Sequence, residues 1–212
     1  MSEKDQPGEG GISRRGFLKG AGATVAATTF IGAAREGMAE AARASRPDKL
    51  AAGKEHAITL TLNGRKGVKL KVHVADTLLE VVREKLQLTG AKPVCEMGTC
   101  GACTLIVDGR PVNSCLFLAV DADGCTVETV EGLAREGRLH PVQQAFIEED
   151  ASQCGFCTPG MVMSCKALVD RNPSPTTDEV KEALSGNLCR CGTYANIFRA
   201  MERVASRTGR GR

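Results

Sequence analysis

The 212-residue sequence is poor in the side chains that fill a large core: it has no Trp, one Tyr and six Phe, so aromatic residues make up 3% of the chain. It also lacks the long apolar runs of a multi-span membrane protein, which excludes that class. With 42% hydrophobic and 25% charged residues, a wholly disordered chain and a collagen-like fibre are excluded as well. We therefore expect a globular chain of one ordinary domain or two small ones. Because the core has few large side chains, metals or disulfides are expected to stabilise it.

The chain also lacks a large excess of either positive or negative charge. The chain has 28 basic and 25 acidic residues, a net charge of +3, and the basic residues are scattered. A nucleic-acid partner is not expected from this balance. Histidine is rarer still, and His56, His73 and His140 stand alone in the sequence, so each is expected to be a strand or helix-start residue rather than a metal ligand.

The amino terminus has the three parts of an export signal. Arg14 and Arg15 precede Phe17, Leu18 and Lys19, a weakly apolar stretch follows, and small residues come next. The pattern is similar to the twin-arginine signal, which carries folded proteins out of the bacterial cytoplasm. We predict a signal peptide over residues 1–44, a linker over residues 45–54 and a periplasmic location.

A Sec signal or an uncleaved membrane anchor is the alternative for the same segment. Lys19 and the many glycines argue against a spanning helix, which would need about 20 strongly apolar residues. The chain is accordingly not expected to be an integral membrane protein.

Residues 55–133 have the pattern of a small α+β domain. Apolar residues alternate over residues 58–62 and 68–74 on either side of Asn63-Gly64, which predicts a β-hairpin. Asp76 is expected to cap a helix through Leu86. Further strands are expected at residues 104–107, 111–118 and 126–130.

From residue 138 to 206 the period becomes helical. Helices are expected to start at Pro141 and at Thr158-Pro159, a capping box of Thr176 and Glu179 starts a third, and residues 194–204 form a fourth. This is a second, all-α domain. Residues 207–212 are expected to be a flexible tail.

Cysteine is unusually frequent for a chain of this length, and all ten cysteines lie between Cys95 and Cys191. The first four have the spacing C-x4-C-x2-C followed by one more distant cysteine, which is typical of a plant-type 2Fe-2S ferredoxin. Small residues between them let backbone N–H groups approach the sulfur atoms. The predicted ligands are Cys95, Cys100, Cys103 and Cys115.

The second set consists of a C-x2-C pair and a C-x-C pair, each in a turn before a predicted helix. Two such turns can converge on one site, and four thiolates suit a second 2Fe-2S cluster. Helix N-termini directed at the site would offset its negative charge. The predicted ligands are Cys154, Cys157, Cys189 and Cys191.

Three other uses of the cysteines fit the sequence less well. A disulfide framework conflicts with folding in a reducing compartment before export. Structural zinc does not need the x4 spacing or the Gly-rich loop, and the x1 spacing is tight for it. A Rieske centre would need two histidines close to the cysteines. Cys125 and Cys165 are left over and are expected to be small buried apolar residues.

Four motifs together resemble one family, the small iron-sulfur subunits of the xanthine oxidase family of molybdenum hydroxylases, and especially those of exported aldehyde oxidoreductases. The motifs are CEMGTCGACT (residues 95–104), DGRPVNSC (108–115), QCGFCTPGM (153–161) and GNLCRCGTY (186–194). The resemblance covers about residues 55–205. Val94 departs from it, because the family commonly has Gly there.

The resemblance implies an N-terminal β-grasp ferredoxin domain followed by an all-α four-helix 2Fe-2S-binding domain. It implies an inner cluster on the cysteines of the helical domain, close to a molybdopterin, of the cytosine dinucleotide type, in a large catalytic subunit, and an outer cluster on the first four cysteines. Gln153 and Cys191 match the family's contacts to the pterin.

By this resemblance the chain has no catalytic residue and relays electrons from molybdenum to an FAD-binding subunit or a cytochrome. A freestanding two-cluster carrier is the alternative function. Glu148, Glu149 and Asp150 are expected to form a solvated helix end rather than a pair of catalytic carboxylates.

Overall fold

The computed structural model describes residues 53–209, and the side chains of residues 53–207. The predicted signal peptide, residues 45–52 of the predicted linker and residues 210–212 lie outside the described residues. The described residues belong to one compact unit. This unit has two hydrophobic cores, one under a β-sheet and one among helices.

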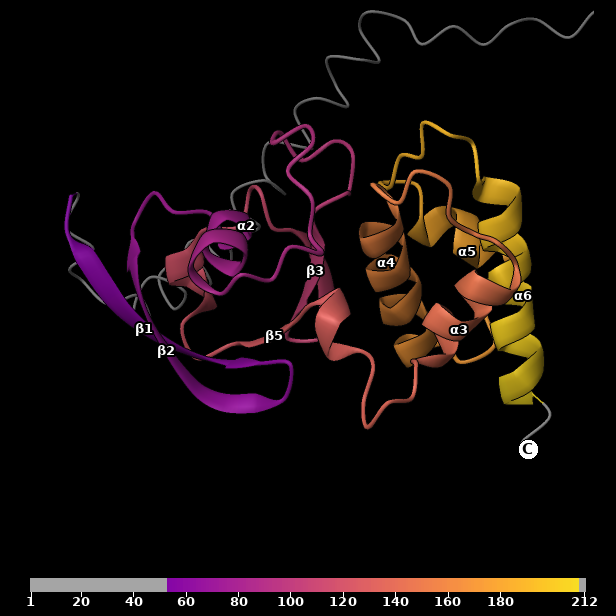
Figure 1. Ribbon diagram of the computed structural model, residues 1–212, viewed down its shortest axis with the longest axis horizontal. Helices are drawn as coiled ribbons and strands as arrows, with labels where there is room; N and C mark the ends of the chain where they lie inside the picture. The colour runs from indigo at the N-terminus through magenta and orange to yellow at the C-terminus, as the bar shows by residue number, and fades with distance from the viewer. Residues whose placement is uncertain (1–52, 210–212) are drawn as a thin grey trace, which may run out of the picture. The chain divides into compact units, whose positions relative to one another are not determined.

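The first part is a mixed five-stranded sheet with the order β2-β1-β5-β3-β4. β1 runs parallel to β5, and the other neighbours are antiparallel (Figure 1). The strands are β1 Glu55–Leu62, β2 Arg65–His73, β3 Thr104–Val107, β4 Arg110–Asn113 and β5 Thr126–Glu128. This arrangement confirms the predicted α+β class.

The two last strands are shorter than predicted. β4 ends at Asn113 because the chain turns there, and the Leu116 N–H donates to the Asn113 carbonyl oxygen at 2.9 Å. β5 ends at Glu128 because a short 3-10 helix starts at Val130. The turn after β4 also carries Cys115, so the chain leaves the sheet where that cysteine is needed.

The hairpin forms because its sequence supplies both the turn and the register. Asn63 and Gly64 both have positive φ angles, 50° and 83°, which a two-residue hairpin turn of this kind requires. Ile58 and Leu60 alternate with more exposed neighbours and are buried in the sheet core. The one-sided burial fixes the pairing of β1 with β2, because a shift of one residue would expose both side chains.

The helix that crosses the sheet differs from the prediction in its start and its type. Thr77, rather than Asp76, is the N-cap, and it forms a capping box with Glu80. The α-helical segment is α2 Leu78–Glu80, and the chain continues as a π-helix, η1 Val81–Lys85. Asp76 instead accepts a hydrogen bond from the backbone of His73 and pairs with Lys85.

Four helices form the second part: α3 Pro141–Glu148, α4 Thr158–Arg171, α5 Thr177–Ala183 and α6 Tyr194–Gly209. The predicted starts at Pro141, Thr158 and Tyr194 are confirmed, as is the capping box of Thr176 with Glu179. α6 is longer than predicted and takes in residues 207–209 of the expected tail. His140 caps α3 through its ring, together with Gln143, a role that its position before Pro141 allows.

β3 joins the two parts. Leu105 and Val107 lie in the sheet core, whereas Ile106, on the opposite face of the same strand, lies in the helical core. All four residues of β3 are buried for this reason, and α4 packs against the strand (Figure 1). Within the described part of the chain, none of the helices combines the length and the apolar character needed to cross a membrane.

Candidate metal centres

The first four cysteines meet around one loop and one strand end. Cys95, Cys100 and Cys103 lie in the loop before β3, and Cys115 follows β4. The thiol of Cys95 contacts that of Cys100, and the thiol of Cys115 contacts that of Cys103. Cys115 is also close enough to Cys95 for their charges to interact. The structure therefore brings all four predicted residues together as two contacting pairs.

Hydrogen-bond donors surround the more exposed of these thiols. The Thr99 hydroxyl, the backbone N–H of Met97 and the neighbouring Cys100 lower the pKa of Cys95 to about 6. Burial, together with Cys103, raises the pKa of Cys115 to about 11, although the N–H of Gly98 opposes the rise. Glu96 and Gly98 have positive φ angles, which turn successive N–H groups of the loop toward sulfur. The loop thus favours negative charge at sulfur.

The second four cysteines also meet in pairs. Cys157 is the N-cap of α4, and Cys154 lies three residues before it. Cys189 and Cys191 precede α6. The thiol of Cys154 contacts that of Cys191, and the thiol of Cys157 contacts that of Cys189. The two predicted turns therefore converge, as their positions before two helices suggested.

In this second set, backbone donors again offset burial. Burial would raise the pKa of Cys189, but the N–H groups of Thr193, Cys191 and Gly192 and the neighbouring Cys157 lower it overall. The Thr193 N–H lies 3.5 Å from Cys189 Sγ. Burial raises the pKa of Cys157 to about 12. The backbone N–H donors therefore favour a thiolate at Cys189.

The pairwise arrangement suits a two-iron group better than a single ion. Among residues 53–209, no three His, Cys, Asp or Glu side chains converge closely enough to hold one metal ion. All ten cysteines are free, so the structure does not support a disulfide framework. A 2Fe-2S cluster takes four thiolates, two on each iron, which matches two contacting pairs in each set. The donor set therefore fits two such clusters.

A buried hydroxyl supports the same fit at the second set. Thr193 Oγ1 is buried, and it is the one such side-chain oxygen or nitrogen in the described residues that lacks a hydrogen-bond partner. Leaving a buried hydroxyl unpaired costs roughly 1–3 kcal/mol. An acceptor bound at Cys189 and Cys191 would remove that cost. Sequence reasoning missed this residue, and its only signal was its place in the GNLCRCGTY motif.

A short bridge joins the two sets. The Leu188 N–H donates to the Cys100 carbonyl oxygen at 2.9 Å, so a neighbour of Cys189 is hydrogen-bonded to a cysteine of the first set. Asn187 holds this bridge from a buried position. Its Nδ2 donates to the Gly101 carbonyl oxygen at 3.0 Å, and its Oδ1 accepts from the Ser164 hydroxyl at 2.8 Å. The two sites are thus fixed to each other through main chain.

Gly101 has a role that sequence reasoning missed. The sequence predicts that it lets an N–H group approach sulfur, but the structure gives it a packing role as well. Its φ is 67°, and a Cβ atom there would lie 2.5 Å from both Asn187 Nδ2 and the Gly186 carbonyl oxygen. A Cβ atom on Gly160 of α4 would lie 2.2 Å from the Gly101 carbonyl oxygen. Glycine is therefore needed for the close approach of the two parts.

The remaining candidate residues lie at the edges of these sites or away from them. Gln153 is exposed beside Cys154. Cys165 is fully buried in the helical core, as predicted, and Cys125 is only partly buried against the sheet core.

Of the three acidic residues at the end of α3, Glu148 and Asp150 are exposed, as expected of a solvated helix end, and Glu149 is partly buried. Glu148 and Glu149 form ion pairs with Arg199, Arg203 and Arg207 of α6.

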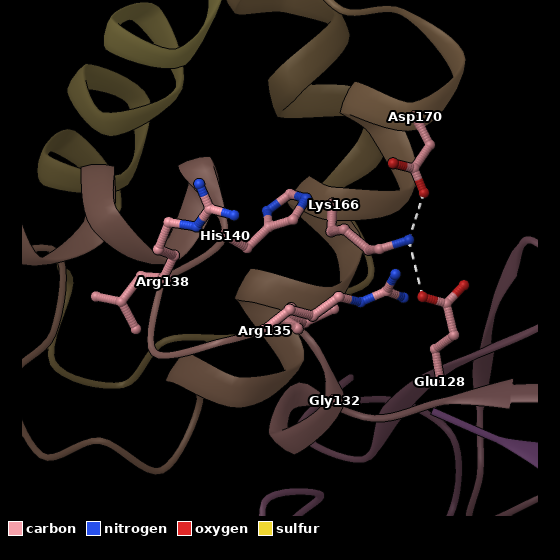
Figure 2. Close-up of a pocket in the computed structure, with 9 residues that line it drawn as sticks. Glu128, Gly132, Arg135, Arg138, His140, Lys166 and Asp170 are labelled. Carbon is pink, nitrogen blue, oxygen red and sulfur yellow. Dashed lines mark hydrogen bonds and ion pairs between the residues drawn. The ribbon is translucent and has the colours of Figure 1, made fainter. Parts of the chain in front are cut away.

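A separate charged cavity of about 370 Å³ lies between β5, α4 and the turn before α3. Figure 2 shows Lys166 at its wall, with the ammonium group between Glu128 and Asp170 at 3.0 and 2.5 Å. Arg135, Arg138 and His140 also line the cavity. Its lining contains no cysteine, so this cluster ties α4 to β5 and is no part of the two candidate centres.

Comparison with known families finds matches over the residues that carry these two sites. Residues 60–124 match the family described as 2Fe-2S iron-sulfur cluster binding domain, and residues 129–202 match the family described as [2Fe-2S] binding domain. Residues 11–30 match the TAT (twin-arginine translocation) pathway signal sequence. The predicted signal type and the two cluster-binding domains are confirmed by these matches.

Curated proteins of similar sequence match between about two thirds and nearly all of the chain. The chain is 39% identical to the aldehyde oxidoreductase iron-sulfur-binding subunit PaoA of Escherichia coli (strain K12), over 95% of this chain and 92% of that protein. It is 45% identical to the nicotinate dehydrogenase small FeS subunit of Eubacterium barkeri, over 71% of this chain and 95% of that protein.

Solved structures show the same fold. Quinoline 2-oxidoreductase from Pseudomonas putida 86 matches with a TM-score of 0.70 and 44% identity, over 75% of this chain and 99% of that chain. The aldehyde oxidoreductase from Desulfovibrio gigas matches with a TM-score of 0.70 and 36% identity, over 74% of this chain and 18% of that chain.

Proposed function

Because this chain belongs to the family of small iron-sulfur subunits of molybdenum hydroxylases, we propose that its eight paired cysteines bind two 2Fe-2S clusters that relay electrons out of a molybdenum site. The chain is a non-catalytic electron-transfer subunit of an oxidoreductase. The observation that carries the proposal is the meeting of the thiols in two pairs per domain, with the two sets tied by the Leu188–Cys100 hydrogen bond.

The outer cluster would be held by Cys95, Cys100, Cys103 and Cys115, and the inner cluster by Cys154, Cys157, Cys189 and Cys191. When bound, each cluster accepts and gives one electron at a time. The chain's own residues hold the thiolates in place and direct backbone N–H groups at sulfur, which stabilises added negative charge. Cys103 and Cys115 are buried and Cys157 is partly buried, which limits the access of water.

The fixed bridge between the two sets supports transfer from one cluster to the other. The route from Cys189 through the Leu188 peptide to Cys100 contains one hydrogen bond of 2.9 Å and is otherwise covalent. Asn187 is 5% exposed and makes hydrogen bonds on both sides of this route, so the bridge cannot open without breaking buried contacts. The chain would thus keep the clusters at constant separation.

The inner set faces outward in part, which suits a partner subunit. Cys154, Cys191 and Gln153 are exposed, whereas a completed electron-transfer site would be shielded from water. We propose that a large molybdenum-binding subunit covers them, with Gln153 and Cys191 against its molybdopterin, of the cytosine dinucleotide type. An FAD-binding subunit or a cytochrome would take the electrons from the outer cluster.

The substrate of the complex would be bound by the large subunit. The relatives named above act on aldehydes, nicotinate and quinoline by their names, so an aldehyde or an aromatic N-heterocycle is the proposed substrate class. The twin-arginine signal supports export of the folded subunit, and we propose that the complex works in the periplasm.

Metal analysis and spin resonance test this proposal on the complex purified with a tag on the chain. About four irons and four acid-labile sulfides per chain, with two distinct signals after reduction, are expected. Cys95→Ser should remove one signal and Cys154→Ser the other, because the two residues belong to different sets. Survival of both signals in either variant would overturn the ligand assignment. A freestanding carrier would instead purify without a large molybdenum-containing subunit.

A further inference from the structure

Thr193 is a buried residue whose hydroxyl has no partner within the described part of the chain. The residue is 3% exposed, so bulk water does not solvate it. Its Oγ1 makes no hydrogen bond to any described protein atom. A hydroxyl has one proton to donate and two lone pairs, and buried hydroxyls are nearly always satisfied. An acceptor from outside the chain is the simplest completion.

The Thr193 hydroxyl does not bind the backbone N–H groups at the start of α6, which are the usual partners of a threonine in this position. Thr193 stands at the start of α6, and its carbonyl oxygen accepts the first helical hydrogen bonds, from the N–H groups of Asn196 and Ile197. A threonine in this position normally also caps the helix through its side chain. Because its hydroxyl does not do so, that hydroxyl remains available to another group.

The position of the hydroxyl relative to the inner cysteines follows from the backbone. The Thr193 nitrogen lies 3.5 Å from Cys189 Sγ, and Cys191 is two residues earlier in the chain. In threonine the hydroxyl oxygen lies about 3 to 3.7 Å from the backbone nitrogen of the same residue, depending on the χ1 rotamer. Oγ1 is thus within reach of a group that is bound at Cys189 and Cys191.

We propose that the Thr193 hydroxyl donates a hydrogen bond to a sulfur atom of the inner cluster and makes that cluster easier to reduce. This inference rests on the proposed function. The proton stays on the hydroxyl oxygen, and the one electron comes from the partner's molybdenum site. The hydrogen bond becomes stronger when the bound group gains negative charge, so it favours the reduced state. Thr193 is a tuning residue rather than a cluster ligand.

The outer set offers a parallel within the same chain. There the Thr99 hydroxyl is hydrogen-bonded to the thiol of Cys95. Thr99 is exposed, whereas Thr193 is buried, so a hydrogen bond from Thr193 is less weakened by water. Each cluster would thus have one threonine hydroxyl at its sulfur atoms.

The test is a redox titration of the intact complex followed by spin resonance of each cluster. Thr193→Val keeps the shape of the side chain and removes the hydroxyl. We expect reduction of the inner cluster to become about tenfold less favourable, which is a fall of about 59 mV for a one-electron couple. The outer cluster in the same sample is the internal control and should not shift. Thr193→Ser restores the hydroxyl and should restore the potential.

An unchanged inner potential in Thr193→Val, in a complex that shows both signals, would overturn the inference and leave the proposed function intact. An equal fall in Thr193→Ser would also overturn it, because the loss would then be structural. If the inner cluster is lost in Thr193→Val, the same redox titration is carried out on Thr193→Ala, whose side chain is smaller, and is judged by the same outcomes. A wild-type complex that lacks two iron-sulfur signals would instead refute the proposed function itself.

Discussion

Gly160 marks the point at which α4 comes closest to the loop of the outer cysteines. A methyl group there would lie 2.2 Å from the Gly101 carbonyl oxygen, which is main chain and cannot move aside cheaply. Although Ala usually favours a helix over Gly, we expect Gly160→Ala to destabilise the loaded chain by about 1–3 kcal/mol. The measurement is the urea midpoint from far-UV circular dichroism. Gly186→Ala is the control, because nothing lies within 4 Å of its added methyl group; a similar loss there would contradict the explanation.

Asn187 connects three buried groups from distant parts of the chain. Asn187→Ala would leave the Gly101 carbonyl and the hydroxyls of Ser164 and Thr104 without this partner. We expect the free energy of unfolding to fall by about 2–4 kcal/mol, since three buried hydrogen bonds are lost and the Ser164 hydroxyl is left unpaired, although Thr104 still donates to the Gly101 carbonyl. Hydrogen exchange of the Leu188 amide should also become faster than in the wild type.

The matched control for Asn187 is Ser164→Ala, which removes one of these hydrogen bonds and leaves the contacts to Gly101 and Thr104. Ser164→Ala should lower the free energy of unfolding by less, about 1 kcal/mol. The Leu188 amide should remain protected from hydrogen exchange in this variant. Equal losses in the two variants would show that Asn187 does not hold the bridge.

For individual residues, the sequence predicts the cysteine ligands better than the residues that hold those ligands in place. The cysteine spacing of each set is local and follows from the chemistry of iron and sulfur, so both sets could be found from the printed residues. Asn187 and Gly101 are 86 residues apart, and the orphaned hydroxyl of Thr193 depends on burial. Such roles arise from tertiary contacts, which a single sequence does not reveal.

Among the elements, α4 and β5 are joined by the buried Lys166. Its side chain is 10% exposed and lies between Glu128 and Asp170 (Figure 2). Lys166→Met would leave the Glu128 carboxylate partly buried without its partner. We expect the free energy of unfolding, measured in urea, to fall by about 1–2 kcal/mol. The fall should be smaller than for a fully buried ion pair, because Asp170 is half exposed. Lys181→Met removes an exposed pair with Asp178 and should change stability by less than about 0.5 kcal/mol.

The same ion cluster predicts a pH dependence. Burial alone would lower the pKa of Lys166, but the carboxylates of Asp170 and Glu128 outweigh it and raise the pKa above 10.5. A raised pKa means that the stabilisation is complete below about pH 10.5 and is lost as the pH rises through the folded-state value. The stability difference between wild type and Lys166→Met should therefore be constant from about pH 7 to 9 and shrink at higher pH. If the stability difference grew above pH 10.5, the ion pairs of Lys166 would not be the source of the stabilisation.

Element boundaries show where local patterns suffice and where they do not. Pro141, Thr158 and the Thr176 box each specify a helix start through their own backbone chemistry, and all three starts are where the sequence predicts them. The crossing helix starts at Thr77 rather than Asp76 and ends as a π-helix. Either residue could cap a helix, and the choice between them depends on the ion pair of Asp76 with Lys85.

In the whole molecule, the two cores share β3, so neither part is independent of the other. Ile106 fills the helical core from a strand whose neighbours fill the sheet core. Loss of either part would expose one face of this buried strand. The described residues should thus fold together as one unit.

Export of such a folded unit is the last prediction and belongs to this scale. Because the twin-arginine route carries folded proteins, the double substitution Arg14→Lys and Arg15→Lys should retain the chain in the cytoplasm with its iron and sulfide content unchanged. The measurement is cell fractionation with iron analysis of each fraction. The pair Arg43→Lys and Arg46→Lys conserves charge in the same way outside the matched signal and should leave export intact. Periplasmic accumulation of the first variant, at the level of the second, would mean that the chain is exported by another route.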